Sequence, residues 1–460
     1  MPMLQREECM PGADVTRTIF ASQTGAHLNS NVITGGGDDD TAILQAVLDQ
    51  APACGGIVLI MDGAALVTGL RLYSNTTILC PNAGCGFYLA DGADAALLSN
   101  AHPDYEKIHD SNIAVIGGTY NHNCRGQRHH VPPQEVNGAS GANGVATDND
   151  TGGRWVVGFS FYGVEGLTVR DIVLRDQRTF AMLIANWRHV TMENIYIDLP
   201  HRKDAENQDG IHFWGPGRFL TMRNIRGCSG DDFIALAPDE RDLVSSITDV
   251  LIDGVMLEEA DQGIRLLSRA EGRLDRVTIR NVTGTYKSFG FFICPWFPGH
   301  TAGNYGSIVI ENVDLRPMEP NYTYRDPFLF QVGGAIESLT LRNITSHSPS
   351  HDRTLFELGP PFYDQECRLA RTHVGSLLID GLHLYGHQGV RPLVRLDCAI
   401  DVLTIRNVDE CLGPATQAEE RAPLLCTQAG CNVGLLNLVN LQLERRVIDA
   451  AQGKIEQLRQ

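Results

Sequence analysis

The segment Leu220-Thr-Met-Arg-Asn-Ile225 is one copy of a six-residue pattern that recurs through most of the chain. Each copy reads apolar, any residue, apolar, polar, Asn/Asp/Gly, apolar. Copies begin at Leu167, Val190, Leu220, Val250, Val277, Ile308, Leu339, Leu377 and Leu403, with a further one at Leu436. Successive copies start about 23 to 38 residues apart, which is typical of the coils of a β-solenoid with variable loops.

Within each copy the apolar residues alternate with other residues, so each copy predicts a short strand with one buried face. The Asn/Asp/Gly position then falls where the chain turns, because these residues tolerate a left-handed backbone. Stacked asparagines are expected to form a ladder inside the solenoid. The pattern predicts an all-β fold, a single-stranded right-handed parallel β-helix. An antiparallel β-sandwich is the alternative, but its hairpins would not repeat one hexad at coil spacing.

Three regions are expected along the chain: an N-terminal arm over 1–37, the β-helix over 38–443 and a C-terminal tail or cap helix over 444–460. Acidic residues 38–40 precede apolar residues at helical spacing, so an N-terminal helix is predicted to cap the first coil. Gly55-Gly56 ends this helix, and 57–61 is expected to be a buried strand. Two irregular stretches, 121–154 and 349–373, are predicted to be long loops.

The composition is that of an ordinary folded protein: 460 residues, 43% hydrophobic and 20% charged. Its 37 basic and 55 acidic residues give a net charge of −18, which argues against a nucleic-acid partner. The sequence contains no run of about 18 apolar residues, so no membrane span is predicted. The first residues lack a secretory pattern, so we expect a cytoplasmic protein, or a secreted or periplasmic one if a signal was removed. The 12 cysteines are expected to be buried free thiols.

Carboxylates gather at equivalent places on a second set of strands, before the turns. Asp209 opens one such strand, and Asp231 and Asp232 open the next, 22 residues after Asp209. Equivalent positions on adjacent coils lie about 5 Å apart, so we expect Asp209 and Asp231 to be neighbours, with Asp232 beside them. Three carboxylates on one exposed sheet face repel one another, which raises at least one pKa. A protonated carboxyl beside a carboxylate is what a general acid and a general base require.

Asn207-Gln208-Asp209-Gly210, followed by Gly230-Asp231-Asp232, resembles the two acidic motifs of glycoside hydrolase family 28, the polygalacturonases. The acidic cap helix also resembles the N-terminus of that family. By this resemblance Asp231 matches the general acid, and Asp209 and Asp232 match the pair that activates water. Arg265, in Gly263-Ile264-Arg265, resembles the arginine of a later motif and is implied to bind substrate.

The sequence departs from this family in two places. The Gly-His-Gly motif is absent between Asp232 and Arg265, and Leu267 stands where the family has a lysine. These departures put polygalacturonate specificity in doubt. His212, three residues beyond Asp209, is a candidate replacement for a polar substrate contact, or simply a buried or surface histidine.

Four further side chains are candidate substrate contacts because they fall near the same strands: Trp187, Trp214, Trp296 and Lys287. The tryptophans are expected to stack on sugar rings, although packing in the core explains each of them equally well.

The sequence therefore predicts a glycosidase that cleaves O-glycosidic bonds of a polysaccharide or oligosaccharide with inversion. It is expected to need no cofactor or metal, and to act on a carbohydrate as a monomer or homo-oligomer. A β-helix polysaccharide lyase or transglycosylase is one alternative, because fold does not fix chemistry. A non-catalytic, tailspike-like glycan-binding protein is the other.

Overall fold

A computed structural model describes residues 16–132, 153–202, 204–295, 302–318, 328–347, 354–359, 372–413, 421–450 and 452–460. The chain folds as a right-handed parallel β-helix with a small N-terminal helical cap, as the hexads predict. It divides into two compact units. Unit 1 comprises residues 1–181 and 186–195, and unit 2 comprises residues 182–185 and 196–460. Much of each predicted loop, and Trp296, lie outside the described residues.

Unit 1 begins with the predicted cap. Its helices are α1 (Thr41–Leu48) and α2 (Ala51–Cys54), and Gly55 ends α2 with a φ of +73°. Leu44, Val47 and Leu48 are the buried residues of α1. Strand β1 (Arg17–Phe20) pairs in parallel with β2 (Ile57–Ile60), so part of the predicted N-terminal arm belongs to the folded unit.

The remaining strands of unit 1 are short until β12. They are β3 (Ala64–Val67), β4 (Leu70–Leu72), β5 (Thr76–Leu79), β6 (Gly86–Leu89), β7 (Leu98–Asn100), β8 (Asp110–Ile116), β9 (Thr119–Asn121), β10 (His130–Val131), β11 (Arg154–Trp155) and β12 (Phe159–Arg175), with 3-10 turns at Ala21–Gln23 and Cys124–Gly126. The strand β13 (Met182–Asp198) contributes residues to both units.

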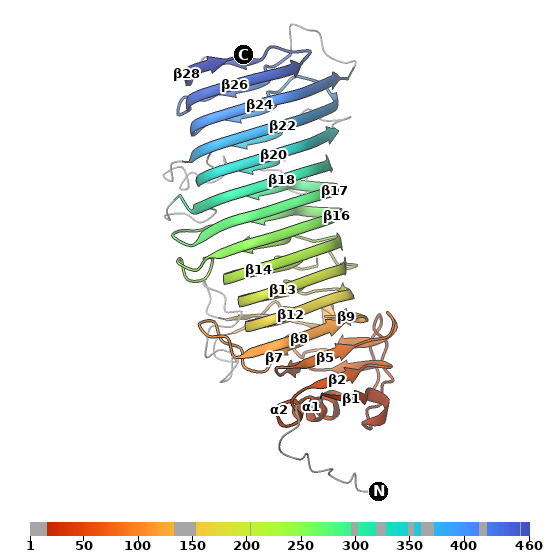
Figure 1. The fold of residues 1–460 in the computed structure, drawn as a ribbon. Helices are drawn as coiled ribbons and strands as arrows, with labels where there is room; N and C mark the ends of the chain where they lie inside the picture. The colour runs from red at the N-terminus through yellow and green to blue at the C-terminus, as the bar shows by residue number, and fades with distance from the viewer. Residues whose placement is uncertain are drawn as a thin grey trace. The chain divides into compact units, whose positions relative to one another are not determined.

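Unit 2 stacks its strands in chain order (Figure 1). They are β14 (Ile211–Gly227), β15 (Asp232–Ala237), β16 (Ile247–Leu266), β17 (Arg273–Ile293), β18 (Asn304–Pro317), β19 (Phe328–Val332), β20 (Ala335–His347), β21 (Phe356–Leu358), β22 (His373–His387), β23 (Val394–Leu396), β24 (Ala399–Leu412), β25 (Leu425–Thr427), β26 (Asn432–Gln442), β27 (Ile448–Asp449) and β28 (Lys454–Arg459). Each of these strands pairs in parallel with its described neighbours, so equivalent residues of successive coils form columns.

The first apolar residue of each hexad forms a buried column in unit 2. It runs through Leu220, Val250, Val277, Ile308, Leu339, Leu377, Leu403 and Leu436. Each coil thus buries its apolar side chains against those of its neighbours, which is how a solenoid builds a core.

The asparagine position of the hexads adopts the left-handed conformation that was predicted. Asn281, Asn312 and Asn343 have φ values of +60°, +57° and +51°. Their side chains form a ladder, with Asn312 Nδ2 donating to Asn281 Oδ1 at 3.0 Å and Asn343 Nδ2 donating to Asn312 Oδ1 at 3.0 Å. The expectation that this ladder lies inside the solenoid is wrong. These side chains are solvent-exposed, because the apolar residues on either side of the turn occupy the interior.

Charges of opposite sign alternate along the polar column of the hexads in unit 2. The column reads Arg223, Asp253, Arg280, Glu311, Arg342, Asp380 and Arg406. Arg280 and Asp253 form an ion pair at 2.8 Å, as do Arg406 and Asp380 at 2.7 Å. Opposite charges on adjacent strands favour the observed register, because a slipped strand would lose these pairs.

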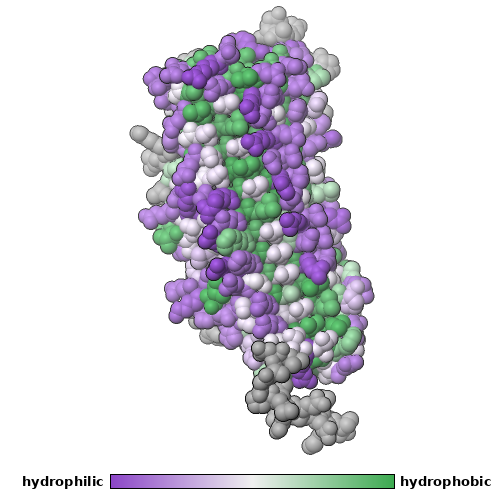
Figure 2. Space-filling model, viewed as in Figure 1, coloured by the Kyte–Doolittle hydropathy of each residue, from purple (hydrophilic) through white to green (hydrophobic). Residues whose placement is uncertain are grey.

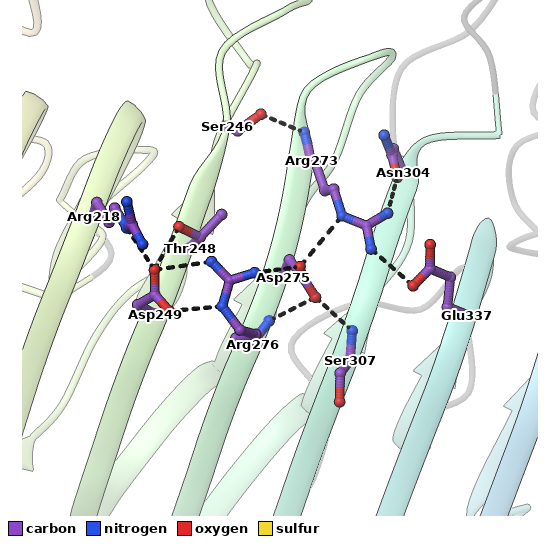
Figure 3. Close-up of polar contacts among 10 residues, drawn as sticks. All are labelled: Arg218, Ser246, Thr248, Asp249, Arg273, Asp275, Arg276, Asn304, Ser307 and Glu337. Carbon is purple, nitrogen blue, oxygen red and sulfur yellow. Dashed lines mark hydrogen bonds and ion pairs between the residues drawn. The ribbon is translucent and has the colours of Figure 1, made fainter.

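A second network of ion pairs links coils near the starts of the long strands (Figure 3). Asp249 contacts Arg218 at 2.7 Å and Arg276 at 2.6 Å, and these guanidinium groups hold its pKa well below its usual range. Asp275 then joins Arg276 to Arg273. On the face of unit 2 drawn in Figure 2, polar side chains flank a band of apolar and neutral ones.

The C-terminal tail differs from its prediction. The expected terminal helix over 444–460 is instead the short strand β27 followed by β28 (Lys454–Arg459). Strand β28 pairs with β26, placing Leu436 beside Leu458. An open solenoid edge offers unpaired backbone groups, and the tail satisfies them as one more strand. None of the described helices is long and apolar enough to cross a membrane. The ten described cysteines are all free thiols.

Candidate functional site

The candidate site of unit 2 lies on β14, β15 and β16 and on the turns that precede and follow them. Ile211, Ile234 and Ile264 align on these three strands and are buried. The next position along each strand forms a second column, from His212 through Ala235 to Arg265. Strand alternation turns this second column away from the apolar interior. The carboxylates lie next to it.

The strand register decides which carboxylates are neighbours. Because Ile211 aligns with Ile234, continuing the register back by two residues places Asp209 beside Asp232. The backbone N–H of Gly210 donates to the carbonyl of Asp232 at 2.9 Å. The expected alignment of Asp209 with Asp231 is therefore wrong by one residue. Asp231 is still close enough for its charge to raise the pKa of Asp209.

Burial of the three carboxylates also differs from the expected exposed face. Asp209 is only 3% exposed, whereas Asp231 and Asp232 are partly exposed. The side chain of His212 contacts Asp209, with Nδ1 2.9 Å from Oδ2. Asp209 is thus covered by a polar partner. Asp231 and Asp232 are each partly exposed, although Oδ1 of Asp232 is itself buried.

His212 lies between two carboxylates. Its Nε2 atom is 2.9 Å from Oε2 of Glu240, on the other side of the ring from Asp209. Although burial opposes the charge, Glu240 and Asp209 together raise the pKa of His212 to about 10. The imidazole is therefore an imidazolium at neutral pH and donates from both nitrogens. In return its charge holds the pKa of Glu240 below the usual value, against the effect of burial.

Asp209 and Asp232 have raised pKa values. Burial is the largest cause for both, and the repulsion between the two carboxylates adds to it, so each pKa rises to about 7. His212 opposes the rise at Asp209, and Arg265 opposes it at Asp232. Two such carboxyls titrate as a pair, so one proton is retained between them near neutral pH.

Two residues of β16 complete the cluster. Gln262 Nε2 donates to Oδ1 of Asp231 at 2.7 Å, which orients the carboxylate. Arg265, the predicted substrate-binding arginine, is 6% exposed, and its guanidinium carbon lies 3.7 Å from the ring centroid of Phe292. That contact fixes the plane of a cation whose charge acts on Asp232.

The other predicted substrate contacts that the structure describes are not presented to solvent. Trp214 is 6% exposed, and its Nε1 donates to Glu240 at 2.8 Å. Trp187 is 2% exposed and belongs to the part of β13 that lies in unit 1. Lys287 is 5% exposed, with Nζ 3.2 Å from Asp261. The stacking role expected for Trp187 and Trp214 is therefore wrong in this structure, because the core and the cluster enclose both rings.

Glu240 is the member of the cluster that the sequence did not indicate. It follows β15 by three residues, in the turn that leads toward β16, and it receives hydrogen bonds from both His212 and Trp214. One signal was present: an acidic pair, Asp239-Glu240, directly follows the strand that carries Asp232. Asp239 instead binds backbone N–H groups of Arg269, Ala270 and Gly272.

No model of a known protein family and no curated protein sequence matches this chain. Solved structures do resemble it. An exopolygalacturonase from Thermotoga maritima is 12% identical, with a TM-score of 0.51 over 95% of this chain and 90% of that one. The Yersinia enterocolitica family 28 exopolygalacturonase is 14% identical, with a TM-score of 0.52 over 94% of this chain and 79% of that one.

A tailspike protein has a higher TM-score with this chain than the two exopolygalacturonases have. A double mutant of the tailspike of E. coli bacteriophage HK620, in complex with pentasaccharide, is 12% identical, with a TM-score of 0.60 over 92% of this chain and 75% of that one. Identities this low show a shared parallel β-helix fold and leave function to be argued from the site.

Proposed function

We propose that this protein is an inverting glycoside hydrolase that cleaves O-glycosidic bonds of a polysaccharide or oligosaccharide. The observation that carries the proposal is the pair Asp209 and Asp232, which repel each other, share a raised pKa of about 7 and lie beside Asp231. Buried ionisable groups cost stability unless they are paired, so such a cluster favours a catalytic role over a structural one.

In the proposed reaction Asp231, assigned as the general acid by its resemblance to the polygalacturonase motif, takes up a proton and donates it to the glycosidic oxygen as the bond to the anomeric carbon breaks. Asp232, with Asp209 beside it, accepts a proton from a water that attacks the anomeric carbon from the opposite face. The sugar then leaves with inverted configuration. A raised pKa suits this role, because the carboxylate is then a stronger base than an ordinary aspartate.

The neighbouring charges act on the two proposed bases. The imidazolium of His212 stabilises the carboxylate form of Asp209, and Arg265 does the same for Asp232. Glu240 in turn fixes the orientation and charge of His212 from its second nitrogen. His212 and Glu240 are therefore proposed as positioning residues, while Asp231 and Asp232 contact the reacting atoms.

A carbohydrate substrate is also supported by the two classes of solved structure that share the fold. Two of these similar structures are exopolygalacturonases, and the third is a tailspike in complex with a pentasaccharide. Leu267 occupies the place of the lysine found in the polygalacturonases and is buried. We therefore propose a glycan other than plain polygalacturonate as the preferred substrate.

A reducing-sugar screen over pectic, fructan and neutral plant glycans tests this function. The wild-type protein is compared with Asp231→Asn, Asp232→Asn and Asp209→Asn, and with Asp401→Asn as a matched control, because Asp401 is an exposed carboxylate of unit 2 that contacts His373. On the cleaved glycan, the three cluster variants should lose about a hundredfold to ten-thousandfold in turnover, and the control should lose none.

Three outcomes would contradict the proposal. Near-normal turnover in Asp231→Asn would show that Asp231 is not the general acid. An unsaturated product that absorbs ultraviolet light identifies a lyase. Glycan binding without release of reducing ends across the whole panel identifies a binding protein of the tailspike type. Proton NMR of the first product shows whether the anomeric configuration is inverted.

A further inference from the structure

Unit 1 contains a pocket whose lining residues are all separate from the carboxylate cluster. Its volume is about 340 Å³, at the lower end of the range of about 300–1,000 Å³ that small-ligand sites occupy. The lining comes from α1, β4, β7, β11 and β12 and the segments beside them. The residues that matter here are Gln45, Arg71, Ser99, Arg154, Trp155 and Ser160.

Three polar side chains form one column along the pocket. Arg71 on β4 aligns with Ser99 on β7, and Ser99 aligns with Ser160 on β12. Adjacent strands lie about 4.8 Å apart, so the column presents one guanidinium and two hydroxyls in a row. Among the described residues neither hydroxyl has a hydrogen-bond partner.

The cap helix fixes the backbone at one end of this column. The side chain of Gln45 receives a hydrogen bond from the N–H of Arg71 at 2.9 Å and donates one to its carbonyl at 3.2 Å. The guanidinium of Arg71 is left exposed, and no carboxylate of the described residues forms an ion pair with it. Arg71 can therefore bind an anion without breaking a contact of the fold.

Strand β11 provides a second cation and an aromatic ring. Arg154 Nη2 donates to the carbonyl of Asp94 at 2.6 Å, while its Nε is buried and has no hydrogen-bond partner among the described residues. Trp155 packs on Phe180, with ring centroids 4.6 Å apart, and also lines the pocket. Its Nε1 is likewise buried without a partner in the described structure. An unpaired buried donor costs free energy that a ligand would recover.

The charge of the described lining is opposite to that of the chain. Among the described residues, the lining includes two arginines and no acidic residue, although the chain as a whole carries a net charge of −18. The nearby carboxylate of Asp94 is bound to Arg128 at 2.5 Å. A cationic pocket on an acidic protein selects a negatively charged ligand. Hydroxyls in a row and one aromatic ring are the usual partners of a sugar.

We propose that this pocket of unit 1 is a binding site for a sugar residue that carries one negative charge. The acidic group, a carboxylate or a sulfate, lies against Arg71 and Arg154. The ring hydroxyls bond to Ser99 and Ser160, and one apolar face of the ring packs on Trp155. The described lining offers no carboxyl to act as acid or base, so the proposed role is binding without cleavage, and this role is independent of the hydrolase function.

Binding is measured by calorimetry and ligand-observed NMR on the full chain carrying Asp231→Asn, so that no probe is consumed. The probes are galacturonic acid, galactose 6-sulfate, neutral galactose, and acetate and sulfate as bare anions. We expect one or both charged sugars to bind, and galactose and the bare anions to bind at least about tenfold more weakly. The two charged sugars distinguish a carboxylate site from a sulfate site.

Substitutions then locate the binding. Arg71→Gln should weaken binding of the charged sugar by about tenfold or more, because a hydrogen bond to a charged group is lost, and Ser160→Ala by a smaller factor. Arg170→Gln is the matched control, since Arg170 is an exposed arginine of the same unit that contacts Asp171. The proposal would be overturned if neither charged sugar binds more tightly than galactose, or if affinity is unchanged in both Arg71→Gln and Ser160→Ala. A protein that binds the charged sugar but hydrolyses nothing would retain this site and lose only the proposed hydrolase function.

Discussion

His212 Nε2 lies 2.9 Å from Oε2 of Glu240, a residue 28 positions later in the chain. This contact converts a histidine that would otherwise be neutral when buried into a stable cation, because Glu240 raises the pKa of His212 and Asp209 raises it further. Glu240, which lies on the next coil, therefore influences the pKa of Asp209 through His212, although no local sequence motif links Glu240 to Asp209. The cluster functions electrostatically as a chain from Glu240 through His212 to Asp209.

The first prediction concerns His212→Gln. Removing the imidazolium takes away the group that lowers the pKa of Asp209, so that pKa should rise further. The acidic limb of the pH–rate profile should then move to higher pH, with a loss of turnover of about tenfold or more near neutral pH. His373→Gln is the control, because His373 is an exposed histidine of unit 2 that contacts Asp401. An unshifted acidic limb in His212→Gln would show that Asp209 does not take part in the ionisation that limits turnover.

The second prediction concerns Glu240→Gln. The amide retains an oxygen that accepts from Trp214, but it removes the negative charge that raises the pKa of His212. The pKa of His212, followed by NMR of its ring protons, should fall. The free energy of unfolding near neutral pH should decrease by roughly 1 to 3 kcal/mol, because a charged hydrogen bond in a buried cluster is lost. A His212 that titrates at the same pH in both proteins would contradict the arrangement.

The third prediction is the pH dependence of stability from Asp209 and Asp232. Their folded-state pKa values of about 7 exceed the usual value of 3.8, so between these limits the folded protein holds protons that the unfolded chain has released. This pair should therefore make the protein less stable as pH rises from about 4 to 7. Asp232→Asn should flatten that part of the stability curve, measured by denaturant unfolding at several pH values. An equally steep decline in Asp232→Asn would show that the pair is not its source.

His212 makes a separate contribution to the pH dependence of the free energy of unfolding. Its folded-state pKa of about 10 lies above the usual value of 6.5, so its stabilisation is complete below about 6.5 and is lost as pH rises toward 10. In His212→Gln the loss of stability between about pH 7 and 10 should be smaller than in the wild-type protein. The same unfolding measurements give this comparison.

The fourth prediction concerns the alternating charges of the hexads. Asp253 aligns with Arg223 on one side and Arg280 on the other. Asp253→Lys would place three positive charges in consecutive positions and should lower the free energy of unfolding by about 1 kcal/mol at low salt. Asp253→Asn, which removes the charge without reversing it, should cost less. The difference between the two variants should shrink at 1 M salt, where the Debye length is about 3 Å, and a salt-independent difference would argue against an electrostatic origin.

The hexads alone determined much of this protein. Alternation in Val277–Val282 settles which side chains enter the core, and Asn281 fixes the left-handed turn, because both effects depend only on the residue and its immediate neighbours. The cap helix could also be predicted from the sequence, since its apolar spacing and Gly55 are local signals. The gathering of Asp231 and Asp232 near Asp209 followed from coil spacing.

The tertiary structure decided what depends on contacts between coils. The pairing of Asp209 with Asp232 in place of Asp231 follows from the hydrogen bonds between strands. The spacing of the motifs does not determine this register to within one residue. The place of Glu240 beside His212 depends on the path of a turn, and the Lys454–Arg459 strand forms because the edge of β26 is open to pairing. A sequence pattern specifies the face on which a side chain lies, but the partner it meets there is chosen by register, turn geometry and burial across residues distant in the chain.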